Sequence, residues 1–225
     1  MDGGYFLRRT ARLVRAYPWS CLAAWLTMAI PWLTIDAGGL DPRLDSVASL
    51  GSVFAQFLLT SALLRREGMH HAWGKPGRVA TYVVQGVVTV LCLMAGALLL
   101  IVPAIYLYAR WLVVLPLVIG EGLGVRGALR TSWHRMGPWI GPAMVAVAAI
   151  FAPAALLCLG VLSFFGLDAP LPLWPVLASD IVIPTCMVGS WVLAVAAHLL
   201  LAPPDPAAGA GAATDAPYMP PASPA

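Results

Sequence analysis

Two charges interrupt one of the most apolar parts of the chain. The stretch PAIYLYARWLVVLPLVIGEG, residues 103–122, contains Arg110 near its middle and Glu121 near its end. A charge in the centre of a bilayer costs from about 2.5 to more than 10 kcal/mol, so such residues usually face the protein interior or a wet cavity. Arg110 is therefore the side chain best suited to hold helices together or to bind an anionic ligand. The alternative is that Arg110 snorkels toward Tyr106 and Tyr108 at the membrane surface.

Helical spacing indicates which partners these two charges can reach. Glu121 lies eleven residues after Arg110, which is about 16 Å along a straight helix, so the two cannot pair directly. Asp180 lies early in a later apolar segment that enters the membrane from the same side as Arg110, and it is the expected partner of Arg110. Glu121 should lie at the cytoplasmic surface, where Arg126 or Arg130 can reach it. These five residues are the candidate functional residues.

The composition indicates the class of protein. The chain has 225 residues, of which 60% are hydrophobic and 10% are charged, against roughly 45–50% and about 25% in soluble domains. A mean hydropathy of +0.85 and long uncharged runs indicate a polytopic membrane protein. The runs lack the alternation of a membrane β-barrel. We therefore predict an all-α fold, a bundle of transmembrane helices.

Six helical spans fit the apolar runs, each near the ~20 residues that cross a bilayer. The run Val79–Gly120 is too long for one span and should fold back at Pro103, the best helix breaker within it. The expected spans are 18–35, 47–64, 79–101, 104–120, 139–165 and 174–201. An N-terminal amphipathic segment, 1–17, precedes them, and a tail rich in Pro and Ala, 202–225, is expected to be disordered.

The distribution of basic residues supports this topology. Basic residues gather before the first span, between the second and third, and between the fourth and fifth: Arg8, Arg9, Arg12, Arg15; Arg65, Arg66, Lys75, Arg78; Arg126, Arg130, Arg135. The intervening loops contain Arg43 as their only basic residue. The positive-inside rule places the basic segments, and with them both chain termini, on the cytoplasmic side.

Two of the basic segments are predicted to form helices in the headgroup layer. Three arginines of segment 1–17 share one helical face, and segment 122–137 carries Arg126, Arg130 and His134 as a stripe beside apolar residues. Such faces attract anionic lipids at about 1 kcal/mol per basic residue. The alternative is that both segments are short linkers whose charges only set the topology.

Little in the sequence favours catalysis. It contains no zinc-ligand spacing, nucleotide-binding loop or serine nucleophile motif. His70 and His71 lack nearby ligands, and four scattered cysteines are expected to be buried small hydrophobic residues: Cys21, Cys92, Cys158 and Cys186. We therefore expect no enzymatic activity, cofactor, metal site or nucleic-acid partner. Membrane lipids, most of all anionic ones, are the expected ligands, and no protein partner is indicated.

The region from Pro103 to Trp139 resembles a family of bacterial integral membrane proteins. The shared pattern is a Pro and Tyr-Leu opening, an Arg in the span, a Pro near its end, a Glu, and Ala-Leu-x-x-Ser-Trp before the chain returns to the membrane. The matching positions are Pro103, Tyr106, Leu107, Arg110, Pro116, Glu121, Ala128, Leu129, Ser132 and Trp133. The family is related to the glycerophosphoryl diester phosphodiesterase membrane domain and to YciC-like proteins. The resemblance implies a bacterial plasma membrane protein, and it does not extend to the catalytic domain fused to some relatives.

Two functions fit these observations. In the first, the chain is a plasma membrane protein without enzymatic activity, in which Arg110 and Glu121 organise a helical hairpin and the interfacial helix 122–137, with a role in envelope or lipid homeostasis. In the alternative, the chain is a small transporter or transporter subunit whose Arg110 binds an anionic solute or lipid. A lipid-modifying enzyme, a third class, would need a cluster of polar side chains at the interface. Burial of Arg110 against Asp180 or carbonyl groups favours the first, and a water-accessible path favours the second.

Overall fold

The structure is a computed structural model, which describes residues 2–38, 44–69, 86, 101–166 and 172–202. These residues form helices and turns without any strand, as the sequence predicts. Five segments are long and apolar enough to cross a membrane: Pro18–Gly38, Ala48–Arg66, Val102–Glu121, Val125–Phe165 and Leu173–Leu201. They correspond to five of the six expected spans. The remaining span, 79–101, lies outside the described residues except at positions 86 and 101, and the tail from 203 onward also lies outside them.

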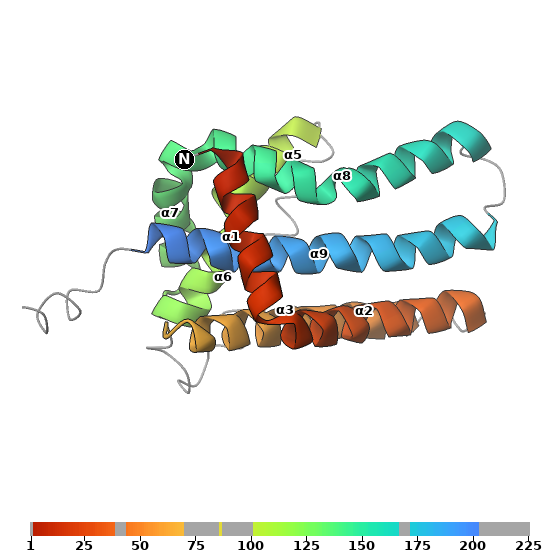
Figure 1. Cartoon of the computed structure of the whole chain (residues 1–225), viewed down its shortest axis with the longest axis horizontal. Helices are drawn as coiled ribbons and strands as arrows, with labels where there is room; N and C mark the ends of the chain where they lie inside the picture. Colours follow the sequence, from red (N-terminus) through yellow and green to blue (C-terminus); the bar gives the residue numbers. More distant parts are fainter. Residues whose placement is uncertain (1, 39–43, 70–85, 87–100, 167–171, 203–225) are drawn as a thin grey trace, which may run out of the picture.

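The central element is α9 (Leu173–Leu201), which packs against α2 (Pro18–Gly38), α3 (Leu44–Arg66) and α8 (Ile140–Phe165). These four helices run along the long axis of the molecule (Figure 1). In the most apolar part of α9, 67% of the residues are buried, against 11% in the most apolar part of the segment Val125–Phe165, which contains α8. The exposed apolar side chains of α8 include Val145, Leu156, Leu159, Leu162 and Phe164. Such a surface suits contact with lipid tails.

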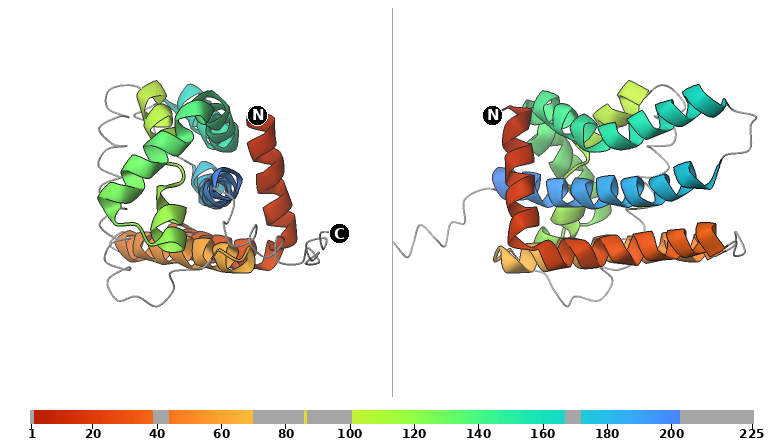
Figure 2. Two further views of the ribbon diagram at one scale, coloured as in Figure 1. Left: turned by 90° about the vertical axis from the view of Figure 1, so that its left-hand side faces the viewer. Right: turned by 45° about the vertical axis from the view of Figure 1, so that its right-hand side comes forward.

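The first helix, α1 (Gly3–Ala16), lies across the others near one end of the bundle (Figures 1 and 2). Its apolar face is confirmed, because Phe6 and Leu13 are almost completely buried. This face packs on α8 and α9, so it contacts protein where the sequence suggested lipid. The fit is close, since a Cβ at Gly3 would lie 3.0 Å from the Pro142 carbonyl oxygen.

The end of the bundle that holds α1 also holds α7 (Val125–Met136) and the C-terminal ends of α3 and α9 (Figure 1). We call it the basic end, because most of the described arginines lie there: Arg8, Arg9, Arg12, Arg15, Arg65, Arg66, Arg126, Arg130 and Arg135. Exposed arginines occupy the outer faces of both α1 and α7. A helix is therefore present in the predicted segment 122–137, as α7, and its place in the headgroup layer stays a prediction; a short 3₁₀ turn, η2 (Gly137–Trp139), connects it to α8.

The span predicted at 104–120 is wrong as one continuous helix. Helix α5 (Ile101–Arg110) carries Pro103 in its first turn, near the predicted start of the span, but after Arg110 the regular helix gives way to a tight turn at 111–113. It resumes as α6 (Val114–Pro116) and a π-helix, η1 (Leu117–Glu121). Pro116 lacks an N–H group and cannot donate to the Leu112 carbonyl, which weakens the helix at this point.

The cysteines bear out the sequence analysis only in part. Cys21 and Cys186 are buried, as predicted. Cys158 is exposed on α8, so the prediction of burial is wrong for this residue. The outward face of α8 is apolar along most of its length, and a small, weakly polar thiol fits such a surface as well as it fits a core. Cys92 lies outside the described residues.

Candidate functional site

The candidate site begins with the broken backbone between α5 and α6. In a regular helix the Arg110 carbonyl would accept a hydrogen bond from the N–H of Val114. Here the Val114 N–H donates to Trp111, at 3.0 Å, which closes a tighter turn and leaves the Arg110 carbonyl without its helical donor. The hydroxyl of Ser132, which is fully buried on α7, donates to that carbonyl at 2.8 Å. A side chain of α7 thus replaces a backbone donor of the broken helix.

The guanidinium of Arg110 makes the reciprocal contact with α7. Its Nη1 donates to the Trp133 carbonyl oxygen at 3.0 Å, and its Nε donates to the Tyr106 hydroxyl at 3.0 Å. Its Cζ atom also lies 4.6 Å from the centre of a Trp133 ring and 5.3 Å from that of Tyr106, within the range of cation–π attraction. We call Tyr106, Arg110, Ser132 and Trp133 the Arg110 clasp.

Close packing fixes the geometry of the Arg110 clasp. The Tyr106 and Trp133 rings meet edge to face, with their centroids 6.2 Å apart, an arrangement that aromatic pairs favour. A Cβ at Gly137 would lie 3.2 Å from Nη1 of Arg110. The guanidinium therefore fits against a residue that has no side chain to obstruct it, and the clasp holds the broken span against the start of η2.

The structure does not bring Arg110 to Asp180. Asp180 is 5% exposed on α9, and none of the ion pairs between described residues joins it to Arg110. The pair was expected only because both residues enter the membrane from the same side. The Arg110 guanidinium instead meets α7, where the Trp133 carbonyl and two aromatic rings take the place of a carboxylate.

Glu121 has a different partner from those predicted. Arg135 binds it with both terminal nitrogens, at 2.5 Å from Oε1 and 3.1 Å from Oε2, a bidentate geometry that strengthens ion pairs. Arg126 and Arg130 are exposed on the outer face of α7. Gly122, with a φ of 71°, ends η1 in the left-handed conformation and turns the chain back toward α7. That reversal brings the inner edge of α7 to Glu121.

A buried histidine lies beside this ion pair. The Nε2 atom of His198 is 3.9 Å from Oε1 of Glu121, and the side chain of His198 is completely buried on α9. Neither ring nitrogen of His198 has a hydrogen-bond partner among the described residues. Gly120 also contacts His198, since a Cβ there would lie 3.6 Å from Nε2. The π-helix η1 is therefore packed against α9 as well as tied to α7.

Sequence reasoning missed Arg135, although helical periodicity contains the signal. The buried residues of α7 are Ala128, Ser132 and Met136, and Arg135 lies three residues after Ser132 and seven after Ala128. Residues at these spacings share a helical face. The same periodicity places Arg126 and Arg130 on the outer side, where they are found.

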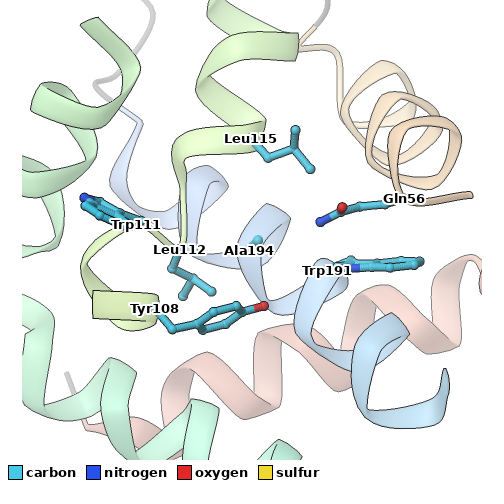
Figure 3. Close-up of a pocket in the computed structure, with 7 residues that line it drawn as sticks. All are labelled: Gln56, Tyr108, Trp111, Leu112, Leu115, Trp191 and Ala194. Carbon is cyan, nitrogen blue, oxygen red and sulfur yellow. The ribbon is translucent and has the colours of Figure 1, made fainter. Parts of the chain in front are cut away.

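Two other features bear on possible chemistry. Within the part of the chain that the structure describes, no three His, Cys, Asp or Glu side chains converge as metal ligands. A small pocket of about 60 Å³ lies between α3, the α5–α6 break and α9 (Figure 3). Its described lining residues are Gln56, Tyr108, Trp111, Leu112, Leu115, Trp191 and Ala194, and they do not include Arg110.

Comparison with known proteins adds no identification. No family model, curated protein or solved structure matches the chain. Function therefore has to be argued from the geometry of the helices and of the Arg110 clasp.

Proposed function

We propose that the chain is a multi-pass protein of the bacterial plasma membrane that acts as a fixed scaffold, without enzymatic activity, in envelope or lipid homeostasis. The observation that carries this proposal is the occupation of the Arg110 guanidinium. Two of its three nitrogens donate to groups of the chain itself, and two aromatic rings lie against it. A transporter that recognised an anion through Arg110 would need those donors directed into a water-filled path.

The polar groups around the clasp are also engaged in structural contacts. The Ser132 hydroxyl donates to the Arg110 carbonyl, and the Glu121 carboxylate is bound by Arg135. A nucleophile or general base has to be free to reach a substrate. Their engagement supports a structural role for this region over a catalytic one.

The arginines left exposed at the basic end are the groups proposed to meet lipid headgroups. Arg126 and Arg130 on α7, and three further arginines on α1, point away from the protein: Arg8, Arg12 and Arg15. The Arg110 clasp fixes α7 to the broken span and so fixes the orientation of its basic face. Such a face, on the cytoplasmic side, attracts anionic lipids.

A lipid-selectivity experiment tests the proposal. The protein is purified into nanodiscs that contain equal amounts of phosphatidylglycerol and phosphatidylcholine, and the lipids that stay bound are measured by native mass spectrometry. We expect enrichment of phosphatidylglycerol, and loss of that enrichment in the double variant Arg126→Gln, Arg130→Gln with no change in thermal midpoint. Equal retention of both lipids by the unaltered protein would contradict the lipid role.

Replacement of Arg110 distinguishes the proposed scaffold function from a transport function. Arg110→Lys keeps the charge but loses the planar donors and the stacking geometry, so a scaffold predicts a lower thermal midpoint. If the variant keeps its midpoint while proteoliposomes lose uptake of an anionic solute, the scaffold is wrong. A reporter fused after Leu201 should appear in the cytoplasm, and activity in the periplasm would overturn the proposed topology.

A further inference from the structure

We propose that the pocket beside the broken span is a binding site for a small uncharged solute that both donates and accepts hydrogen bonds. The pocket lies between α3, α9 and the turn residues Trp111 and Leu112 (Figure 3). Neither Arg110 nor the basic faces of α1 and α7 contribute to it. The inference therefore goes beyond the proposed scaffold and does not depend on it.

The first observation is the interruption of the regular helix. Trp111 and Leu112 lie outside any helix, in the middle of a segment long and apolar enough to cross a membrane. Pro116 cannot donate to the Leu112 carbonyl, which therefore lacks its usual helical donor. At membrane depth, irregular backbone is tolerated only where it is buried in protein or lines a polar cavity. Interrupted membrane helices often form solute sites for this reason.

The second observation is the set of polar groups that surrounds the pocket. Gln56 comes from α3, Tyr108 from α5 and Trp191 from α9, so three separate helices contribute. The Gln56 carboxamide and the Tyr108 hydroxyl point toward the space beside Trp191 (Figure 3). The Tyr108 hydroxyl also bonds Ser190, so it keeps the capacity to accept from a solute, whereas the Gln56 carboxamide can donate and accept and an indole N–H only donates. A solute with both kinds of group would match this lining.

The walls of the pocket are held in place by packing. The Tyr108 ring lies edge to face against Phe151 of α8, with centroids 5.9 Å apart. Trp191 is only 4% exposed and belongs to the core formed with α2 and α3. These contacts fix two of the polar groups without needing a bound ligand, which reduces the entropy lost on binding.

Charge and size restrict the solute. None of the described lining residues is an acid, a lysine, an arginine or a histidine, so these residues offer no counter-charge against the high desolvation cost of an ion. The pocket volume of about 60 Å³ is several times the 10–15 Å³ or so that one water needs. It is far below the roughly 300–1,000 Å³ of drug-sized sites. A polyol or amide of a few heavy atoms fits, whereas a lipid headgroup does not.

Glycerol is a suitable probe for this site. The full chain is labelled with 5-fluorotryptophan, placed in nanodiscs and titrated with glycerol, while ¹⁹F NMR follows each tryptophan signal, assigned through single Trp→Phe variants. We expect the signals of Trp111 and Trp191 to shift and saturate. The signal of Trp19, which is 79% exposed, should change only linearly with glycerol concentration.

Two pocket variants and one control keep the test decisive. Tyr108→Phe removes only a hydroxyl and should weaken the apparent glycerol affinity by roughly fivefold to tenfold, the effect of about one lost hydrogen bond. Gln56→Leu should weaken it at least as much and serves if the first variant does not fold. Ser163→Ala, on the exposed side of α8, should leave the affinity unchanged.

Two results would overturn the proposal. The first is a Trp191 signal that changes only linearly, in parallel with Trp19, which would mean that the pocket holds water alone. The second is a saturable shift that survives unchanged in both pocket variants, which would place the binding elsewhere. Neither result would alter the evidence for the scaffold, because Arg110 and the exposed arginines take no part in the titration.

Discussion

The Arg110 clasp joins α5 to α7, and a second group of residues, the Glu67 cluster, joins α1 to the end of α3. In the Glu67 cluster, Glu67 accepts hydrogen bonds from Arg9 at 3.2 Å and from the Tyr17 hydroxyl at 3.0 Å. The Cζ atom of Arg66 lies 5.1 Å from the centre of the Tyr17 ring. Both groups therefore combine arginine, an aromatic ring and hydrogen bonds at the same end of the molecule.

The two groups differ in what their hydrogen bonds satisfy. The clasp binds two main-chain carbonyls, those of Arg110 and Trp133, and one of them lost its donor when the helix broke. The Glu67 cluster joins side chains only, and the side chains of Arg9 and Glu67 keep 28% and 22% of their surface exposed. Ser132 is fully buried, so water cannot readily replace the hydrogen bond that it donates to the Arg110 carbonyl, whereas water can replace the partly exposed contacts of the Glu67 cluster. The comparison therefore predicts a large effect from breaking the clasp and a small one from breaking the cluster.

Loss of the Arg110 side chain should have the largest effect. Arg110→Ala removes a charged hydrogen bond to a carbonyl and contacts with two aromatic rings, at an expected cost of about 2–4 kcal/mol in the free energy of unfolding. Thermal unfolding in detergent, followed by tryptophan fluorescence, should show a midpoint lowered by several degrees. Arg126→Ala, on the exposed face of the same junction, is the matched control and should be neutral. Equal effects from the two variants would remove the distinction between the clasp and the surface.

Removal of the Ser132 hydroxyl should come next. Ser132→Ala leaves the Arg110 carbonyl buried without a donor, which costs about 1–3 kcal/mol. Amide hydrogen exchange at Trp111 and Leu112 should become faster, because the tight turn that contains them loses its hydrogen bond to α7. Ser163→Ala is the control, since that hydroxyl donates within its own helix to Leu159 at 2.7 Å on the exposed side of α8. Unchanged exchange in Ser132→Ala would show that the break does not depend on α7.

Much of the fold could be predicted because a membrane imposes local rules. The length of each apolar run and the alternation of basic and neutral loops placed five helices close to where the structure has them, and the periodicity of segments 1–17 and 122–137 identified α1 and α7. The break after Arg110 could not be predicted in the same way. Pro116 lies six residues downstream, and its absent N–H only weakens the helix. The tight turn after Arg110 is stabilised by the hydroxyl of Ser132, which lies in another helix, α7.

The candidate site was predictable only in its central residue. Of the five candidate residues, Arg110 alone lies in the clasp, whereas Tyr106, Ser132 and Trp133 stood among the ten positions of the resemblance and were not predicted to form a site. The expected pair with Asp180 failed because it was inferred only from the side on which both residues enter the membrane, and a partner that is a main-chain carbonyl leaves no trace in the sequence. The partner of Glu121 was predicted wrongly for a different reason. Arg135 lies at helical spacing from the buried residues of α7, so the periodicity of this helix already favours it over Arg126 and Arg130.

The ion pair between Glu121 and Arg135 should rank below the clasp. Its side chains are 28% and 21% exposed, so solvent weakens the pair, and its bidentate geometry restores part of that loss. Glu121→Gln should lower the free energy of unfolding by at most about 1 kcal/mol. The difference from the unaltered protein should shrink in high salt, measured as thermal midpoints at two ionic strengths. A salt-independent loss would instead indicate that burial of His198 depends on the carboxylate.

The Glu67 cluster should give the smallest effect, and a pH titration can isolate it. The hydrogen bond to Glu67 is the main cause that raises the pKa of the Tyr17 phenol above its ordinary value of 10.0. The folded state therefore favours the neutral phenol, and the stability that this contributes is present below pH 10 and is lost as the pH rises through the raised pKa. Subtracting the ultraviolet titration of Tyr17→Phe from that of the unaltered protein gives the pKa of Tyr17 alone. In Glu67→Ala the pKa of Tyr17 should fall back toward the ordinary value. The thermal midpoint at neutral pH should barely change, because water replaces the lost partner. A midpoint shift as large as that of Ser132→Ala would show that side-chain contacts at this surface stabilise the fold as much as a hydrogen-bonded main-chain carbonyl does.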